Sequence, residues 1–211
     1  HGKGQFSTPK GEIYHGEFVQ GKKQGEGIMQ QDHDDGAQYM GEWVRGYRHG
    51  RGTGKWPDGS MYMGQWLEGQ VGGAGKHTWA DGSCYHGEHT SGVRHGRGRM
   101  QYVDGSRYEG DYEAGYKHGN GRSAHGDLYE GRFVEDSMHG IGTYQSAHGE
   151  VYEGEWLNHL PHGTGKYVQA NGNQYEGDFL RGKRTGKGTL RYSNGDVYEG
   201  SMEDGKPYGE G

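Results

Sequence analysis

The sequence has few of the residues from which an ordinary globular core is built. Only 28% of its 211 residues are hydrophobic and the mean hydropathy is −1.21, which excludes a thick aliphatic core. No apolar run approaches the roughly 18 residues that a membrane-spanning helix needs. The single cysteine, Cys84, excludes a disulfide framework and is typical of a protein from a reducing compartment.

Periodic glycine and aromatic residues take the place of the missing aliphatics. The chain has 47 glycines, and 12% of its residues are aromatic, so a thin core of rings can replace a thick one. A representative segment is Tyr152-Glu153-Gly154-Glu155-Trp156. On a strand, alternation places Tyr152, Gly154 and Trp156 on one face and the acids on the other. This pattern recurs every 21 to 25 residues, which predicts a repeat architecture. The nine copies start at Tyr14, Tyr39, Tyr62, Tyr85, Tyr108, Tyr129, Tyr152, Tyr175 and Tyr198.

Each repeat is predicted to form one β-hairpin. Asp-Gly turns such as Asp58-Gly59 alternate with glycine turns such as residues 114–119, and no segment has the apolar period of a helix. We therefore expect an all-β fold without helices, an elongated single-layer solenoid of antiparallel β-hairpins. It forms one continuous array over residues 1–211, interpreted as a fragment of a longer chain because it starts in mid-pattern. The widest spacing is attributed to a loop insertion at residues 32–35.

Three glycine positions in each repeat are assigned separate roles. Gly154 lets two large rings close over the backbone, while Gly163 and Gly165 are expected to bend or bulge the second strand. The turn glycine is expected to need a positive φ. Asp136 and His159 stand at that turn position in two repeats, and both residue types tolerate the left-handed region.

The repeat reads Tyr-x-Gly-x-aromatic, then Gly-Lys-x-x-Gly-x-Gly, then Asp-Gly, and it resembles the MORN repeat (membrane occupation and recognition nexus). Residues 152–165 and 175–188 match that pattern nearly letter for letter, and the resemblance covers essentially the whole chain. It implies the fold but leaves the function open, since MORN arrays occur in junctional membrane proteins, phosphoinositide kinases, a lysine methyltransferase and cytoskeletal adaptors. A chain made only of these repeats is similar to the MORN-only scaffold proteins of protozoan parasites. That likeness implies an oligomeric role in the cytoskeleton and in cell division.

We predict a non-enzymatic structural scaffold or adaptor that organises cytoskeletal proteins. No set of catalytic residues stands outside the repeat period and a shallow ribbon offers no closed pocket, so neither enzyme activity nor a cofactor is expected. The net charge of −6 argues against nucleic-acid binding. The expected location is cytoplasmic, at the cytoskeleton, with the inner membrane surface as a further site.

The C-terminal repeats are predicted to form an antiparallel homodimer. The strand around residues 198–202 has no complete neighbour in this sequence, so a second copy would cover its backbone groups and rings. The residues assigned to this interface are Tyr175, Phe179, Leu190, Tyr192, Tyr198, Met202 and Tyr208.

The alternative function is a peripheral module that binds anionic phospholipids. Basic residues near the glycine turns are expected to share an edge that attracts anionic lipid head groups or an acidic partner. These residues are Arg48, Arg51, Arg94, Arg97, Lys117, Lys183 and Arg184. His-Gly pairs, as at His95, recur on the same edge, and both a pH-sensitive contact and an ordinary turn residue remain open there.

The fourth repeat departs from the pattern. His89 stands where other repeats have tryptophan, and His77 stands where they have Met, Leu or Tyr. Cys84 and His86 are expected on the opposite face, so four metal-ligand types occur within a short segment. A zinc site completed by a partner chain is therefore a hypothesis, beside the simpler interpretation of a locally polar repeat.

Overall fold

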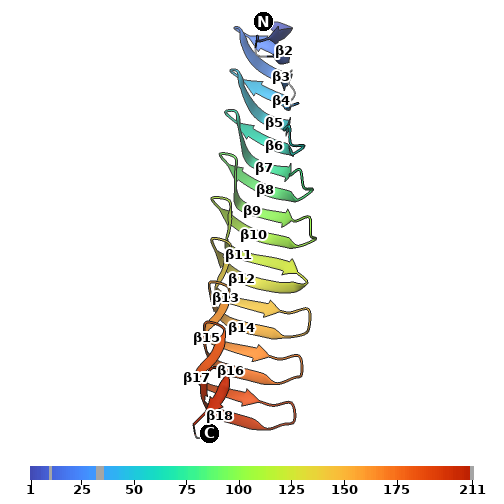
Figure 1. The fold of residues 1–211 in the computed structure, drawn as a ribbon. Coiled ribbons are helices and arrows are strands. Elements are labelled where there is room, and N and C mark those ends of the chain that lie inside the picture. Colours follow the sequence, from blue (N-terminus) through green and yellow to red (C-terminus); the bar gives the residue numbers. More distant parts are fainter. Residues whose placement is uncertain (10, 32–35, 210–211) are drawn as a thin grey trace. The chain divides into compact units, whose positions relative to one another are not determined.

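Every regular element of the protein is a β-strand. The computed structural model describes residues 1–9, 11–31 and 36–209 (Figure 1). These ranges contain no helix. None of the described residues therefore forms a helix long and apolar enough to cross a membrane. The prediction of an all-β chain without helices is confirmed. The loop insertion expected at residues 32–35 lies outside the described residues.

The strands fall into two compact units. The first unit ends at Gly105 and the second begins at Ser106. The strands of the first unit are β1 (Gly2–Ser7), β2 (Glu12–Val19), β3 (Lys22–Gln31), β4 (Gln38–Val44), β5 (Tyr47–Lys55), β6 (Met61–Leu67), β7 (Gln70–Thr78), β8 (Cys84–Thr90) and β9 (Val93–Gln101). Those of the second unit are β10 (Arg107–Glu113), β11 (Tyr116–His125), β12 (Asp127–Val134), β13 (Ser137–Gln145), β14 (Val151–Leu157), β15 (Leu160–Val168), β16 (Gln174–Leu180), β17 (Lys183–Arg191), β18 (Val197–Glu203) and β19 (Lys206–Tyr208).

Within each unit, consecutive strands pair antiparallel and form a single layer, as the hairpin pattern predicts. The register places glycine opposite glycine, so that Gly41 faces Gly52, Gly52 faces Gly64 and Gly64 faces Gly75. We call this line of glycines the glycine row. In the first unit it comprises Gly4, Gly16, Gly27, Gly41, Gly52, Gly64, Gly75, Gly87 and Gly98. In the second unit it comprises Gly110, Gly121, Gly131, Gly142, Gly154, Gly165, Gly177, Gly188 and Gly200.

The glycine turns that join the two strands of a hairpin are tight. Gly46, Gly69 and Gly182 have φ of 93°, 87° and 81°, and Asp136 and His159 at the same position both have φ of 67°. The predicted need for positive φ is confirmed. The residue before each of them also has a positive φ, which is the geometry of the type I′ turn that joins hairpin strands.

The six-residue turn predicted over residues 114–119 is wrong. Only Ala114 and Gly115 lie in the turn, and β11 begins at Tyr116, which faces Glu113. The next glycine along the segment, Gly119, has φ of 59° and lies where the register slips. It therefore belongs to a β-bulge inside the strand.

A β-bulge in the second strand confirms the role predicted for Gly163, whereas Gly165 faces Gly154 in the glycine row and lies under the Tyr152 ring. The register of β14 and β15 slips by two residues after Gly154, and Gly163 has φ of 58° there. The Glu155 carboxylate covers the bulge and accepts the backbone N–H of Thr164 at 3.0 Å.

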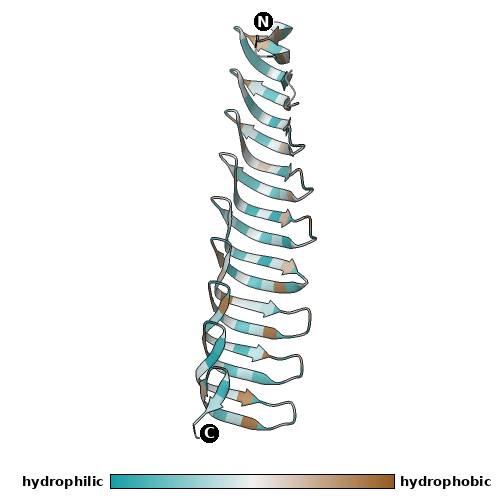
Figure 2. Cartoon of the chain, in the orientation of Figure 1, coloured by the Kyte–Doolittle hydropathy of each residue, from teal (hydrophilic) through white to brown (hydrophobic). Residues whose placement is uncertain are grey.

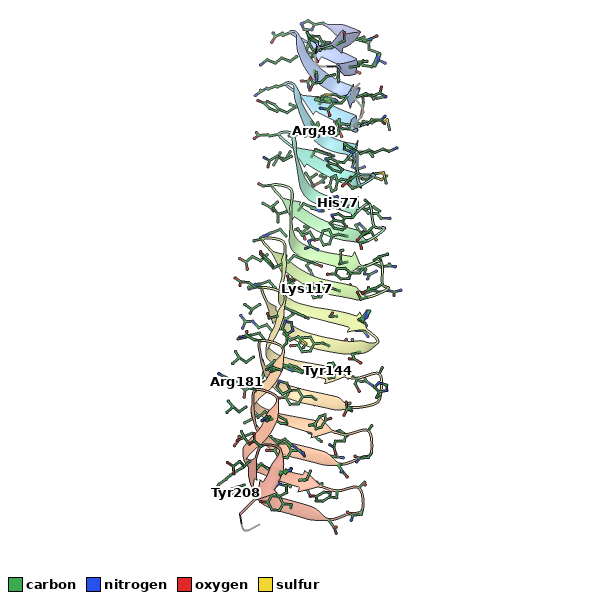
Figure 3. The ribbon with its side chains drawn as sticks, in the orientation of Figure 1. Arg48, His77, Lys117, Tyr144, Arg181 and Tyr208 are labelled. Atoms are coloured by element: carbon green, nitrogen blue, oxygen red, sulfur yellow. The ribbon has the colours of Figure 1, made fainter. Side chains whose placement is uncertain are left out.

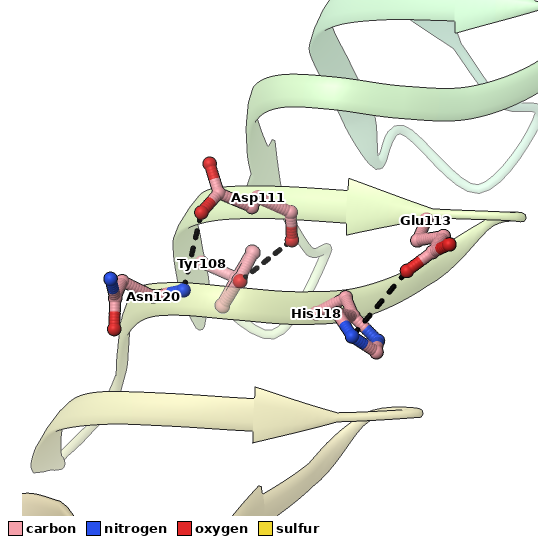
Figure 4. Close-up of polar contacts among 5 residues, drawn as sticks. All are labelled: Tyr108, Asp111, Glu113, His118 and Asn120. Carbon is pink, nitrogen blue, oxygen red and sulfur yellow. Dashed lines mark hydrogen bonds and ion pairs between the residues drawn. The ribbon is translucent and has the colours of Figure 1, made fainter.

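Figure 4 shows the equivalent arrangement at the start of the second unit. The Asp111 carboxylate accepts the backbone N–H of Asn120 at 3.2 Å, and the Tyr108 hydroxyl donates to the Asp111 carbonyl at 2.9 Å. Nε2 of His118 lies 3.4 Å from the Glu113 carboxylate. The acid after the row glycine thus supports the bulge, a role that the alternating pattern alone does not reveal.

The core of each unit is a layer of rings on one face of its sheet, which we call the aromatic face. Figure 2 shows that the ribbon is otherwise mostly hydrophilic or intermediate in hydropathy, with hydrophobic residues in short bands. The buried rings are Tyr14, Tyr39, Trp43, Tyr62, Trp66 and Tyr85 in the first unit and Tyr108, Tyr112, Tyr129, Phe133, Tyr152, Trp156, Tyr175 and Phe179 in the second.

Candidate interaction surface

The rings of the aromatic face bind one another and the backbone. Tyr39 lies edge to face with Trp43 of its own hairpin and with Trp66 of the next, at centroid distances of 5.2 and 5.0 Å. The Tyr39 hydroxyl donates to the Glu42 carbonyl at 2.9 Å, and Nε1 of Trp66 donates to the Gly52 carbonyl at 3.1 Å. The polar groups of Tyr39 and Trp66 are therefore already paired within the fold.

Four of the seven basic residues predicted for a lipid-binding edge lie against these rings. The Arg48 guanidinium is 4.5 Å from the centre of the Trp66 ring and donates to the Gly69 carbonyl at 2.8 Å. Figure 3 labels Arg48 among the side chains of the first unit. Burial lowers the pKa of Arg48. Arg184 repeats this geometry, with a 2.8 Å hydrogen bond to the Gly205 carbonyl.

Lys117 and Arg94 complete this group of four. The Lys117 ammonium lies 5.1 Å from the centre of the Tyr108 ring, and the Arg94 guanidinium lies 5.9 Å from that of Tyr85. Cation–π contact with the aromatic face is thus a recurrent feature of the hairpins.

The remaining three basic residues lie elsewhere. Lys183 pairs with Asp204 at 2.7 Å. Arg51 and Arg97 directly precede row glycines, so alternation places their side chains on the opposite face from the rings. The structure therefore distributes the seven side chains over both faces of the sheet.

His89 occupies the position of the core tryptophan. Its side chain is 4% exposed, and its ring lies edge-on to Tyr62 and Tyr85 at 5.2 and 5.1 Å. Neither imidazole nitrogen makes a hydrogen bond of full geometry among the described residues, and weaker contacts with the backbone of Gly73 and Gly87 oppose only part of the effect of burial. Burial lowers the pKa of His89 to about 4, so the ring is uncharged at neutral pH.

His77 lies on the same face in a stack of three rings. Its ring is nearly parallel to those of Trp56 and Trp79, with centroids 5.5 and 4.4 Å away. Burial lowers the pKa of His77, and the charge of Asp58 partly opposes that shift. The histidine thus extends the aromatic core toward the Asp-Gly turn.

Cys84 and His86 alternate with the buried Tyr85 and therefore lie on the opposite face, as the sequence predicts. In the part of the chain that the structure describes, no three His, Cys, Asp or Glu side chains are placed to hold a metal ion. A zinc site in this repeat would need ligands from a second chain.

The seven residues assigned to a C-terminal interface differ in accessibility. Tyr192 and Tyr208 are 37% and 62% exposed, and Tyr198 is half-buried. The other four are buried on the aromatic face of their own unit, namely Tyr175, Phe179, Leu190 and Met202. Of the seven, only Tyr192, Tyr198 and Tyr208 are accessible to a second copy.

The face opposite the rings, which we call the polar face, carries two rows of side chains beside the glycine row. In the second unit these rows line an open groove of about 1070 Å³. Row A alternates acids with bases or threonine, and Arg122 pairs with Glu130 at 2.7 Å. In this unit row A comprises Glu109, Arg122, Glu130, Thr143, Glu153, Lys166, Glu176, Thr189 and Glu199. Row B lies on the other side of the glycines and lines the groove with Ile141, Thr164, Lys187 and Ser201.

The model of the MORN repeat family matches this sequence at eight places. The matched residues are 14–31, 39–61, 62–84, 85–107, 108–123, 129–151, 152–174 and 175–197, which is most of the chain. The chain belongs to the MORN repeat family. The ninth MORN repeat counted from the sequence, which starts at Tyr198, lies beyond the matched ranges. No curated protein matches the sequence.

Solved structures similar to this MORN chain share little of its sequence. The TCP domain of SAS-4 (dCPAP) from Drosophila melanogaster, solved with a proline-rich motif of Ana2 (dSTIL), is 11% identical. That match covers 72% of this chain and 84% of the other, with a TM-score of 0.43. Streptogramin B lyase is 7% identical over 95% of this chain and 83% of the other, and virginiamycin B lyase from Staphylococcus aureus is 9% identical over 96% and 85%, both with a TM-score of 0.19. Likeness at this level carries no argument about function.

In the first unit, row A of the MORN sheet has a short apolar segment, and Met40 and Met63 in it stand where the second unit has acids. The whole row comprises Gln5, His15, Ile28, Met40, Thr53, Met63, Lys76, His86 and Arg99. Ile28, Met40 and Met63 are 39%, 58% and 56% exposed. Ile28 faces Met40, Met40 faces Thr53 and Thr53 faces Met63, so these four side chains are consecutive in the row. The sequence analysis missed this feature. Its signal was the residue between tyrosine and glycine, which is Met in the second and third repeats and Glu in the last five.

Proposed function

We propose that this chain is a non-enzymatic scaffold, a MORN array that binds protein partners through its polar face. The observation that carries the proposal is the contrast between the two faces. The aromatic face repeats one set of ring contacts and hydrogen bonds. Row A of the polar face instead varies, from an apolar segment at Ile28, Met40 and Met63 in the first unit to acids, bases and threonines in the second. A row whose chemistry varies while the backbone stays the same can bind different partners at different repeats.

Affinity purification of the full chain with two pairs of substitutions tests the proposal. Met40→Thr with Met63→Thr alters the first unit, and Glu153→Thr with Glu176→Thr alters the second. Each pair is expected to lose a different set of bound proteins, since the two parts of row A differ in chemistry. If both variants retain every protein that the unchanged chain captures, the polar face is not the binding face.

A place at the cytoskeleton and a role in cell division form the finer part of the proposal. Their support is the similarity of a repeat-only chain to the MORN-only scaffolds. Proximity labelling with the full chain tests this part, and enrichment of cytoskeletal proteins is the expected outcome. Labelling confined to other compartments contradicts it.

Self-association through the C-terminal repeats is also proposed, supported by the exposed rings of Tyr192 and Tyr208. Light scattering is expected to give twice the 23.4 kDa mass of one chain. Tyr192→Ser with Tyr208→Ser is expected to give the single-chain mass, whereas Tyr47→Ser, at a ring 60% exposed in the first unit, leaves the dimer intact. A monomeric unchanged chain, or a dimer in the double variant, contradicts this interface.

Binding of anionic lipid is the second candidate, favoured by the number of basic residues near the turns. The engagement of Arg48, Arg94, Lys117 and Arg184 with rings weighs against it. Co-sedimentation with phosphatidylserine vesicles at low and high salt separates the candidates. The scaffold proposal expects no binding at either salt concentration, and binding that weakens with salt supports the lipid candidate.

A further inference from the structure

The apolar part of row A in the first unit has a shape and spacing that suit one class of partner. Ile28, Met40, Thr53 and Met63 lie on four successive strands, β3 to β6, at one position in the register. Neighbouring strands are about 4.8 Å apart, so Met40 and Met63 are about 10 Å apart and the row runs across the strands. Exposed methionines are adaptable contacts for apolar partners.

The fold does not require these apolar side chains. In the second unit the equivalent register position carries Glu153, Glu176 and Thr189 beside equivalent pairs of glycines. Charged and polar residues therefore satisfy the backbone at this position. A cluster of apolar residues that packing does not demand, exposed on the surface, is typical of a binding site.

Row B beside this cluster is acidic at one end. Glu26 faces Glu42 directly across the strands, and two like charges in this position repel each other. Glu42 accepts the backbone N–H of Arg51 at 2.8 Å, and neither carboxylate has an ion pair among the described residues. Beyond Arg51 the row continues with Gln65, so the acidic end lies beside Ile28 and Met40. A partner with positive charge at this end would relieve the repulsion.

An amphipathic helix fits both rows. A helix lying across the strands advances about 5 Å in three or four residues, close to the 4.8 Å between strands. Side chains at i, i+4 and i+7 would therefore meet successive residues of row A, in the way that amphipathic helices dock into grooves. Basic residues along one flank of the helix would lie beside Glu26 and Glu42.

We propose that row A of the first unit, from Ile28 to Met63, is a docking site for an amphipathic helix of a partner protein. The helix carries an apolar stripe edged on one side by Lys or Arg. This proposal rests on the scaffold function and assigns a partner class to one part of the polar face. It commits to a protein helix, and a lipid surface is an outcome that the experiment separates.

The test uses the full chain and a designed amphipathic helix as the probe. The probe has leucine at i, i+4, i+7 and i+11 and lysine along one flank, with a fluorescent label for anisotropy. We expect a dissociation constant on the order of 10 μM and a loss of about tenfold or more with Met40→Thr and Met63→Thr. Threonine stands at Thr53, Thr143 and Thr189 in this row, so the variant is expected to fold. Glu153→Thr with Glu176→Thr in the second unit is the matched control and is expected to leave the affinity unchanged.

Methyl NMR of labelled methionine gives a direct readout of the site. The probe is expected to shift the Met40 and Met63 signals and to leave those of the buried Met100 and Met202 in place. Glu26→Gln is expected to weaken binding and to reduce its salt dependence. A probe with glutamate in place of lysine is expected to bind more weakly than the lysine probe.

The outcomes separate this inference from the scaffold function. Absence of probe binding up to about 1 mM, or equal binding by the Met40→Thr, Met63→Thr variant, overturns the docking site and leaves the scaffold proposal standing. If instead the unchanged chain co-sediments with phosphatidylserine vesicles and that variant does not, row A is a lipid surface and both proposals fail.

Discussion

At the scale of single residues, each core tyrosine depends on two glycines. A Cβ atom at Gly64 would lie 2.5 Å from the Gly75 Cα and from the Tyr62 hydroxyl. At Gly75 it would overlap the Tyr62 hydroxyl and ring. The ring is buried and cannot withdraw, so the absence of a side chain is what lets it cover the backbone.

Gly75→Ala is therefore expected to lower the free energy of unfolding by about 2 kcal/mol or more, as overpacking of a filled core does. Urea denaturation measures this. Gly72→Ala in the same strand is the control, because its Cβ would meet only the Leu67 Cβ at an ordinary 3.6 Å. Equal stability of the two variants would show that the glycine row is dispensable.

The buried imidazole of His89 makes stability depend on pH. Its folded-state pKa of about 4 lies below the value of about 6.5 expected in the unfolded chain. Between these values the unfolded chain binds more protons, so stability is lost as the pH falls from 6.5 to 4. The full effect of the shift is about 3 kcal/mol.

His89→Phe is expected to remove this loss, because Phe133 and Phe179 occupy the equivalent core position in other repeats. The difference in unfolding free energy between the variant and the unchanged chain should widen as the pH falls from 7 to 4. Denaturation at several pH values measures it, and His77, whose charge also lowers the pKa of His89, is present in both proteins. Parallel pH curves would contradict the assignment to His89.

At the scale of the hairpin, basic side chains join one element to the next. Arg184 starts in β17, lies 5.5 Å from the centre of the Tyr175 ring and donates to the carbonyl of Gly205 in the following turn. The guanidinium packs over the ring, and one of its N–H groups pairs with a carbonyl of the next hairpin. Both contacts stabilise the junction between the hairpins.

Arg184→Ala is expected to lower the free energy of unfolding by about 1 to 2 kcal/mol through loss of the ring contact and the hydrogen bond. Lys187→Ala, at an exposed side chain of the same strand, is expected to change it by less than about 0.5 kcal/mol. Thermal or urea unfolding measures both. A loss of similar size in the two variants would mean that removal of one positive charge lowers the stability, and not loss of the contacts at the junction.

The turns store a small strain that glycine relieves. His159 has φ of 67° and donates its backbone N–H to the Met138 carbonyl at 3.0 Å. His159→Gly keeps that hydrogen bond and removes the cost of a side chain in the left-handed region, so a gain of up to about 1 kcal/mol is expected. Urea unfolding measures it, and a loss of stability would show that the imidazole makes a contact worth more than the strain.

At the scale of the whole molecule, contacts within each unit join strands that are consecutive in the chain or belong to neighbouring hairpins. Stability in such an array is a sum of local terms, and a defect in one repeat is not transmitted far. Hydrogen exchange can therefore report each repeat separately.

Gly75→Ala is accordingly expected to speed amide exchange in β6, β7 and β8 and to leave β14 to β17 unchanged. Exchange followed by mass spectrometry of peptides measures this. A uniform rise across both units would contradict local stability and would indicate one cooperative core.

The sequence analysis succeeded where the determinants are short-range. The Tyr152 pattern predicts the hairpin, and Asp136 and His159 indicate the positive φ of the turn, because both depend on neighbouring residues. The six-residue turn over residues 114–119 failed because the strand resumes at once and a bulge absorbs the later glycine. Turn and bulge glycines cannot be told apart without the register.

The sequence by itself determined that the chain is a series of antiparallel hairpins with rings on one face, since period-two alternation acts within each strand. Only the tertiary structure decided which charged and apolar side chains remain accessible. Arg48 and Arg184 reach carbonyls 21 residues further along the chain, in the next hairpin. Ile28 and Met63 become part of one surface only because pairing aligns four strands at a common position.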